Sequence, residues 1–496
     1  ASPTWLVENG YYYIRGDVLL NPSLLVTPFR FFRNMLRAPE EWSHEVVPQH
    51  TERIRQLRDF NLKEASARSI VQHFDEVCRI SARCWAWIVI TGAYAKFTEV
   101  IFKRLYEHLT KESNGSHSAL LTGFANKSVE ADEALWELAE IARDREELRT
   151  IILGADTSDA LELLSASETT RDWVQRFNEW LDTYGHPVFE LDFLHETLSD
   201  TPAIALQVVR NYIENRTPSP ASRQRLKLEE RQLAEAHFQK LLANRSLFRG
   251  IIEKSFRLAQ RYAVIRESRP FYLHLGWPMM RRDVLEIGRR LARSGILDDA
   301  NDVFFLTSTE FRQAATNSNA EDLSRKGAKA QSVTAVQRRR REWELQKSLA
   351  PPQHLNPNWL ARLLSRHLAG NSKKERARSG VLIGTPASPG KALGSTCLVK
   401  SPHDFAKFKQ GQILVAPYTT PVWTSLLSLA GGVVTETGGA LSHAAIIARE
   451  YGIPAVVGVA NAVARLPDGT NLEVDGSAGR MHILGSSDRK GIRNEY

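Results

Sequence analysis

The sequence predicts a multidomain α + α/β protein, in which a large, mainly helical domain precedes a compact β/α domain. From about residue 28, apolar residues recur at three- and four-residue spacing with charges between them, as in segments 65–82 and 131–148. From residue 381, short β-branched runs flank one helical segment, and a hairpin pattern follows at residues 472–484. The 496 residues are enough for two or three domains.

The order of these segments predicts the domain boundaries. Residues 5–14 predict a β-hairpin, because Asn9-Gly10 supplies a turn and the flanking aromatic residues favour strands. Helical segments continue to residue 370 and include a polar, basic arm at residues 324–357. The next residues are polar and charged without a large apolar side chain, which is typical of a hinge. We therefore expect a helical domain at 1–370, a hinge at 371–380, a β/α domain at 381–485 and a tail at 486–496.

Composition argues against several classes of function. The 65 basic and 57 acidic residues are mostly interspersed, and no nucleic-acid-binding motif accompanies the basic clusters at 338–341 and 373–378. The longest apolar stretch, residues 85–95, is too short to span a bilayer. The three cysteines form no CxxC pair or zinc pattern, which fits a reducing cytoplasm. We expect a cytoplasmic protein with no nucleic-acid partner, no membrane partner and no metal site.

The most informative stretch contains His443. The run 432–434 predicts a buried strand, Gly438-Gly439 a loop, and the apolar spacing after it a helix with His443 in its first turn. Free N–H groups and the positive end of the helix dipole favour an anion there and disfavour imidazolium. A neutral ring nitrogen is therefore available to attack phosphorus. A lone histidine at this place more often caps or packs, but the surrounding pattern favours a phosphoryl carrier.

That pattern resembles a known family. Thr-x-Thr-Gly-Gly-x-x-Ser-His-Ala-Ala-Ile at residues 435–446, followed by Ala-Arg-Glu-x-Gly-Ile-Pro-Ala-Val-Val-Gly at 448–458, resembles the swivelling phosphohistidine domain of phosphoenolpyruvate-utilising enzymes. The family includes phosphoenolpyruvate synthase, pyruvate phosphate dikinase and rifampicin phosphotransferase. The resemblance implies that His443 carries a phosphoryl group, held by five phosphate-binding residues: Thr435, Thr437, Gly438, Gly439 and Ser442. For the hydroxyls of Thr437 and Ser442, helix capping is an equal alternative.

Shorter islands in the helical body, at 177–186, 261–269 and 285–292, resemble rifampicin-phosphotransferase-like proteins. This resemblance implies that Arg266 grips a phosphoryl oxygen, since a guanidinium binds phosphate with two donors. The alternative is a structural pair with the adjacent glutamate. A proline takes the place of the family's lysine, and Arg269 lies close by as a second candidate. Three residues are expected to bind the acceptor, with core packing as the alternative for the aromatic ones: Arg269, Tyr272 and Trp277.

In the resembled enzymes an ATP-grasp domain phosphorylates the histidine with the β-phosphoryl group of ATP. No ATP-grasp region, GxxxxGK loop or phosphoenolpyruvate-binding barrel is visible in the sequence. The resemblance therefore predicts a dikinase-type phosphotransferase split between subunits. A partner binds ATP and Mg²⁺, and this chain transfers the phosphoryl group to a hydroxyl of a small organic compound. The phosphate then becomes a leaving group for dehydration of that compound. The alternative is a stand-alone phosphocarrier or a regulatory phosphate-binding module.

Overall fold

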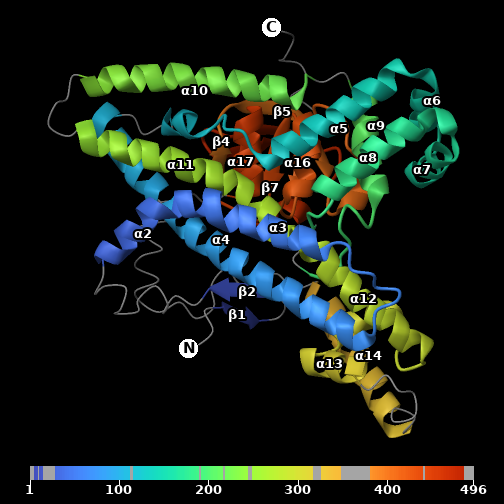
Figure 1. Ribbon diagram of the computed structural model, residues 1–496. Helices are drawn as coiled ribbons and strands as arrows, with labels where there is room; N and C mark the ends of the chain where they lie inside the picture. Colours follow the sequence, from blue (N-terminus) through green and yellow to red (C-terminus); the bar gives the residue numbers. More distant parts are fainter. Residues whose placement is uncertain are drawn as a thin grey trace. The chain divides into compact units, whose positions relative to one another are not determined.

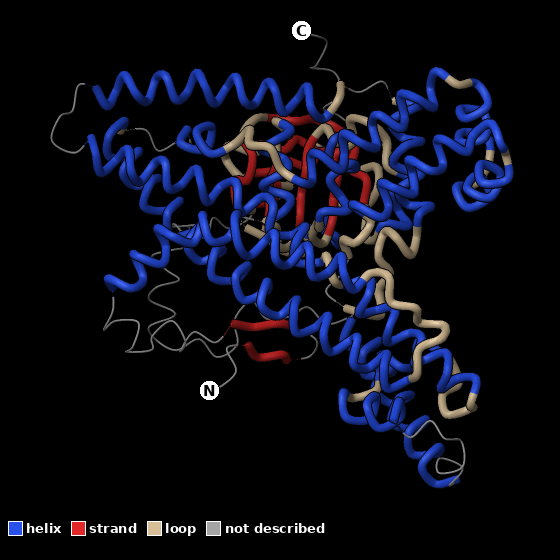
Figure 2. The backbone as a smooth tube through the Cα atoms, in the orientation of Figure 1, coloured by secondary structure: helices blue, strands red, loops and turns tan. Residues whose placement is uncertain are grey.

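The computed structural model describes residues 5–8, 11–14, 28–111, 116–188, 192–215, 218–243, 249–316, 326–347, 380–439 and 442–484. The predicted fold class is confirmed, because a large helical region precedes a C-terminal mixed sheet (Figures 1 and 2). The chain forms two compact units, one from residues 1–82 and 279–376 and the other from residues 83–278 and 377–496. Helices α4 (Ala67–Thr110) and α12 (Trp277–Arg293) contribute to both units.

The first unit is helical apart from one hairpin. The predicted hairpin is present as an antiparallel pair in which Trp5 lies opposite Ile14. The core of this unit gathers apolar side chains of α4, α12 and α13, including Ile70, Ile287 and Phe311. Besides parts of α4 and α12, its elements are β1 (Trp5–Glu8), β2 (Tyr11–Ile14), α2 (Pro28–Glu41), η2 (Trp42–Val46), α3 (Val47–Leu57), η5 (Ala300–Phe305), α13 (Ser308–Thr316) and α14 (Lys326–Lys347). Helix α14 covers most of the predicted basic arm.

The second unit combines helices with the sheet. Long helices alternate with short loops in the order that the apolar spacing predicts. These elements are η3 (Ser116–Leu121), α5 (Lys127–Asp144), α6 (Glu146–Gly154), α7 (Thr157–Ala166), η4 (Glu168–Thr170), α8 (Arg171–Tyr184), α9 (Pro202–Glu214), α10 (Pro220–Ala243) and α11 (Arg249–His274). No described helix has both the length and the apolar character that crossing a bilayer requires.

The sheet of this unit has eight strands in the order β3-β10-β9-β5-β6-β7-β8-β4. Strands β5 to β8 pair in parallel, and the other pairs are antiparallel. The strands are β3 (Val381–Ile383), β4 (Thr385–Ser388), β5 (Lys391–Leu398), β6 (Ile413–Ala416), β7 (Gly432–Thr435), β8 (Ala455–Val457), β9 (Asn471–Asp475) and β10 (Arg480–Ile483). Its helical segments are η6 (Pro402–Lys407), η7 (Pro421–Trp423), α16 (Thr424–Leu429), α17 (His443–Tyr451) and α18 (Ala462–Arg465).

Both faces of β6, β7 and β8 are buried, as their continuous apolar sequences indicate. On β6 and β7, Leu414 and Val433 face the side of α16 and α17, while Ile413, Val415 and Val434 face the side of α18. The first of these cores continues into helices α5 to α9, so the helices and the sheet share one apolar interior. Of the predicted hinge only Gly380 is described, and the predicted tail lies outside the described residues. The domain boundaries at 370 and 381 therefore stay a prediction.

Candidate active site around His443

His443 is the first residue of α17, directly after a glycine loop. Strand β7 is fully buried and leads into Gly438, whose φ of +118° is a conformation that favours glycine. A Cβ on Gly438 would also lie 3.0 Å from the Ser442 side chain. Ser442 caps the helix by accepting a hydrogen bond from the Ala445 N–H at 3.4 Å. The helix ends at Gly452, which has a φ of +67°. The predicted strand, loop and helix are therefore confirmed.

Two threonine hydroxyls flank the His443 imidazole. Thr419 Oγ1 lies 3.0 Å from Nδ1, and Thr424 Oγ1 lies 3.3 Å from Nε2. Burial lowers the pKa of His443 to about 3. The ring is therefore neutral near pH 7, and one of its nitrogens keeps a free lone pair. Such a ring, oriented by two hydroxyls at a helix N-terminus, is suited to nucleophilic attack on a phosphoryl group.

Sequence reasoning missed Thr419 and Thr424 as site residues. The signal was present, because both follow the buried strand β6, which pairs in parallel with β7. The carboxyl ends of neighbouring parallel strands meet at one edge of a sheet, where ligands of α/β proteins commonly bind. The segments after β6 and β7 therefore meet at His443.

The hydroxyls predicted to bind phosphate have protein partners in this structure. Thr435 Oγ1 donates to the carbonyl of Thr437 at 2.8 Å, and Thr437 Oγ1 donates to the carbonyl of Pro417 at 3.1 Å. Ser442 acts as the helix cap, which is the alternative that the sequence left open for it. Together these bonds hold the glycine loop in place beside His443.

Arg266 lies at the other end of α17. Its guanidinium is buried and donates to Glu267 Oε1 at 3.0 and 2.8 Å and to Glu99 Oε2 at 3.2 Å. Burial opposes its charge, but these two carboxylates outweigh burial and raise the pKa of Arg266. Glu450, in the last turn of α17, lies close enough to contribute to the same shift. Glu450 is seven positions after His443, which corresponds to about 10 Å along the helix. The structure therefore brings Arg266 to the end of α17 that is opposite His443. There Arg266 pairs with the adjacent Glu267, which is the structural alternative to phosphate binding that the sequence left open.

The three predicted acceptor-binding residues are not gathered at His443. Arg269 Nη1 donates to the carbonyl of Ile88 at 2.8 Å, and burial lowers the pKa of Arg269 to about 10. Trp277 is buried and stacks on Phe193, with ring centroids 4.4 Å apart. Tyr272 packs against Phe271 and lines a surface hollow beside α5. Trp277 therefore packs in the core, which is the alternative that the sequence left open for it. Tyr272 is partly exposed.

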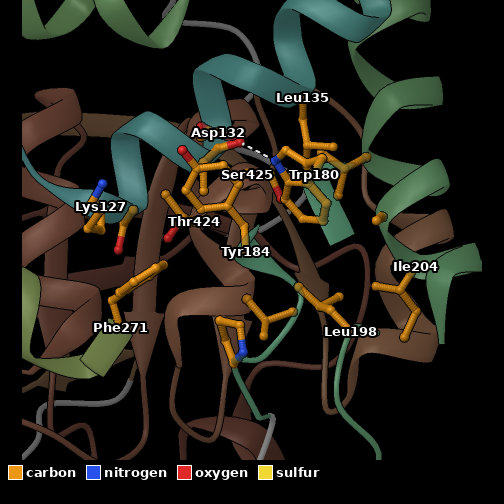
Figure 3. A pocket seen from close by; sticks show the side chains of 16 residues that line it. Lys127, Asp132, Leu135, Trp180, Tyr184, Leu198, Ile204, Phe271, Thr424 and Ser425 are labelled. Atoms are coloured by element: carbon orange, nitrogen blue, oxygen red, sulfur yellow. Dashed lines mark hydrogen bonds between the residues drawn. The ribbon is translucent and has the colours of Figure 1, made fainter. Parts of the chain in front are cut away.

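A cavity that the sequence did not predict lies beside Thr424 (Figure 3). Its walls come from α5, α8, α9, α11, η7 and α16, all within the second unit. Thr424 therefore contacts His443 Nε2 and also lines the cavity. The cavity joins residues that are far apart in the sequence, and no local pattern could have indicated it.

Two buried carboxylates hold the far end of α17. Asp132 accepts hydrogen bonds from the hydroxyls of Tyr212 at 2.7 Å and Tyr451 at 2.6 Å, and burial raises the pKa of Asp132 to about 6. Glu450 accepts a hydrogen bond from the Gly123 N–H at 2.9 Å. Burial, with the nearby Glu267, raises the pKa of Glu450 to about 7. These contacts fix the helix that carries His443 against α5 and the loop after η3.

Two models of known families match parts of this chain. Residues 408–479 match the family model of the PEP-utilising enzyme mobile domain, and residues 86–267 match that of the rifampicin phosphotransferase fourth domain. The chain therefore carries the mobile domain of the phosphoenolpyruvate-utilising enzymes. Within that class it combines this domain with a helical domain of the rifampicin phosphotransferase type.

Individual relatives are similar over most of this chain. An uncharacterized phosphotransferase, YvkC, of Bacillus subtilis is 30% identical over 80% of this chain and 48% of its own length. A rifampicin phosphotransferase of Streptomyces sviceus is 28% identical, over 75% of this chain and 42% of its own. The prodigiosin synthesizing transferase PigC of Serratia marcescens is 26% identical, over 76% of this chain and 41% of its own. The chain thus spans about half the length or less of these relatives. The names of the first two support a phosphotransferase role.

Proposed function

We propose that this chain is a phosphotransferase component of the dikinase type, in which His443 carries a phosphoryl group to a hydroxyl of a small organic acceptor. The observation that supports this most directly is the neutral His443 imidazole at the start of α17, between the hydroxyls of Thr419 and Thr424. The matched mobile-domain model covers this helix.

In the proposed cycle, an ATP-grasp unit binds ATP together with Mg²⁺, and a ring nitrogen of His443 attacks the β-phosphorus of this ATP. The bond between the β-phosphorus and the oxygen of AMP breaks and AMP leaves, while water releases the γ-phosphoryl group as inorganic phosphate. The helix N-terminus then offsets part of the charge of the attached phosphoryl group. The donor unit is proposed to be a partner subunit in the cytoplasm. Phosphorylation of an acceptor hydroxyl also makes it a leaving group, so the product is a candidate for later dehydration.

Labelling of the chain tests this proposal. The chain is incubated with ATP labelled in the β- or the γ-phosphoryl group, together with candidate ATP-grasp proteins. We expect acid-labile, base-stable label from the β-position only, absent in His443→Ala and retained in His482→Ala, whose histidine is exposed on β10. Label that persists in His443→Ala would refute the proposal. A labelled chain that passes its phosphoryl group to no acceptor would favour the stand-alone phosphocarrier.

A further inference from the structure

We propose that the C-terminal ends of α16 and α17 form a proton-dependent latch, which holds the domain that carries His443 against the helices of the second unit and releases it more readily as pH rises. This domain, the carrier, comprises the described residues from 380 to 484, and the helical part of the unit comprises residues 83–278. The carrier matches the mobile-domain model. The inference rests on the proposed function for its consequence, because a carrier of phosphoryl groups has to leave one site to reach another.

The first contact of the latch is a buried hydrogen-bond network around Asp132 of α5. The hydroxyl of Tyr451, the last residue of α17, donates to Asp132 Oδ2 at 2.6 Å. The hydroxyl of Tyr212 on α9 donates to Asp132 Oδ1 at 2.7 Å and lies 3.0 Å from Ser428 Oγ of α16. Two carrier helices therefore meet at one carboxyl of the helical part, and their departure would bring water to that carboxyl.

The second contact lies one residue earlier in α17. Glu450 is buried, and its Oε2 accepts a hydrogen bond from the Gly123 N–H at 2.9 Å. Gly123 belongs to the helical part, in the loop after η3. This hydrogen bond therefore breaks when the carrier leaves, and the Gly123 amide loses its partner.

Cations on α10 complete the latch. Arg223, Lys227 and Arg231 are four positions apart, so they lie on one side of this helix. Arg223 Nη1 donates to the carbonyl of Ser428 in α16 at 2.7 Å, and a Cβ on Gly452, directly after α17, would lie 3.4 Å from Lys227 Nζ. Cations are favourable at helix C-termini, where the helix dipole is negative. These contacts give the latch a part that does not depend on carboxyl protonation.

Asp132 is the first proton site. Burial raises its pKa to about 6. The groups that face it are Tyr451 of α17, Tyr212 of α9, Arg223 of α10 and Glu133 of α5. The two hydroxyls and the guanidinium favour the charged form of Asp132, but burial outweighs them. Once water reaches the released Asp132, its pKa returns toward 3.8.

Glu450 is the second proton site. Burial, followed by the neighbouring Glu267, raises its pKa to about 7, although the Gly123 N–H and two guanidinium groups favour its charged form. Burial lowers the pKa of His117 in η3 to about 4, so this ring stays neutral between pH 5 and pH 8. The charged groups around Glu450 come from α4, α10, α11 and α17 itself: Glu99, Arg231, Arg266, Glu267 and Arg449.

Both carboxyls hold a proton more tightly in the docked state than in the released state, so docking is strongest at acidic pH. It weakens as pH rises from the ordinary pKa values of 3.8 and 4.5 toward 6 and 7, and it changes little above them. Between pH 5 and pH 8, a complete return to the ordinary values would increase release about tenfold through Asp132 and about seventyfold through Glu450. These factors are upper limits, because a partial return gives less.

Hydrogen exchange of the Gly123 amide measures release on the full chain without any donor. Mass spectrometry of the peptide that contains Gly123, under EX2 conditions and corrected for the intrinsic exchange rate, gives the opening constant at each pH. We expect this constant to rise at least tenfold from pH 5 to pH 8. Glu450→Gln keeps the acceptor oxygen but does not titrate, so it should remove most of the rise, and its combination with Asp132→Asn should remove all of it. Glu137→Gln, the same change at an exposed position of α5, should leave the rise unchanged.

A second pair of variants tests the hydrogen bond to the carrier. Tyr451→Phe removes the carrier hydroxyl from Asp132 and should increase the opening constant about tenfold at pH 7, where the carboxyl is largely charged. Tyr184→Phe removes a similar bond, from a hydroxyl to Glu130, but within the helical part, and should leave the constant unchanged. Equal effects of the two changes would overturn the assignment of Tyr451 to the latch.

An opening constant that is independent of pH, or that falls as pH rises, would overturn the proposal. Exchange of Gly123 and of the α8 amides with one common opening constant would also overturn it, because that result reports unfolding instead of release. The proposed function fails separately, if His443 accepts no label from ATP or from potassium phosphoramidate, a small donor that needs no partner protein. The exchange experiment does not depend on that result and still decides whether the latch exists.

Discussion

Asp132 gives the sharpest prediction of stability, because its carboxyl is buried and titrates far from its usual range. Burial raises its pKa from 3.8 to about 6, although the Tyr451 and Tyr212 hydroxyls favour the charged form. Between these two values only the folded state holds the proton, so stability falls as pH rises toward 6 and changes little above it. A shift of about two units corresponds to about 3 kcal/mol, at about 1.4 kcal/mol per unit.

The matched variant is Asp132→Asn, which keeps the shape of the side chain but does not titrate. We expect the difference in unfolding free energy between wild type and variant to fall by about 2.4 kcal/mol between pH 4 and pH 7, because part of the total change already occurs below pH 4. Urea unfolding, followed by tryptophan fluorescence at each pH, measures this difference. All other titrating groups are common to both proteins and cancel. A difference that is independent of pH, or that grows with pH, would refute a buried carboxyl held in its neutral form.

Three further predictions concern the site. Gly438→Ala should destabilise the second unit by about 1–3 kcal/mol, because alanine is strained at the positive φ of this position. Gly439→Ala is the control and should leave the thermal midpoint unchanged, because the added Cβ contacts no neighbouring atom. Equal effects of the two changes would contradict the loop geometry. Arg266→Gln should cost about 3–5 kcal/mol in urea unfolding because the buried carboxylate of Glu267 and the half-buried carboxylate of Glu99 lose their partner, while the exposed Arg55→Gln should have no measurable effect. Since the pKa of His443 is about 3, its labelling by phosphoramidate should show no loss from ring protonation between pH 8 and pH 5.5. A decline with a midpoint near 6.5 would disprove the neutral state of the ring.

Local signals in the sequence predicted the local structure around His443. The Gly-Gly loop, the apolar spacing after it and Gly452 indicated where α17 begins and ends, and the structure agrees. The β-branched runs likewise predicted the buried strands β6, β7 and β8, because strands that are buried on both faces have continuous apolar sequences.

The rest of the site depends on contacts between distant segments. Arg266 has a local glutamate neighbour, but its second carboxylate, Glu99, comes from α4 and lies 167 positions away. The Thr424 cavity draws on six elements whose meeting depends on the packing of the whole unit. A sequence pattern shows that an arginine or a threonine is present, but not which side chain the fold brings to it.

The apolar interior shared by helices α5 to α9 and the sheet also limits how the proposed carrier travels. Leu426, Leu427 and Ile447 are buried in this interior, and exposing one such side chain to water costs about 1.5–3 kcal/mol. A departure of α16 and α17 into open solvent would expose several of them together and would be rare. If a separate unit donates the phosphoryl group, as proposed, that unit would have to cover the same apolar face as the helices release it. Phosphoryl delivery would then be a transfer of the carrier between two docking surfaces.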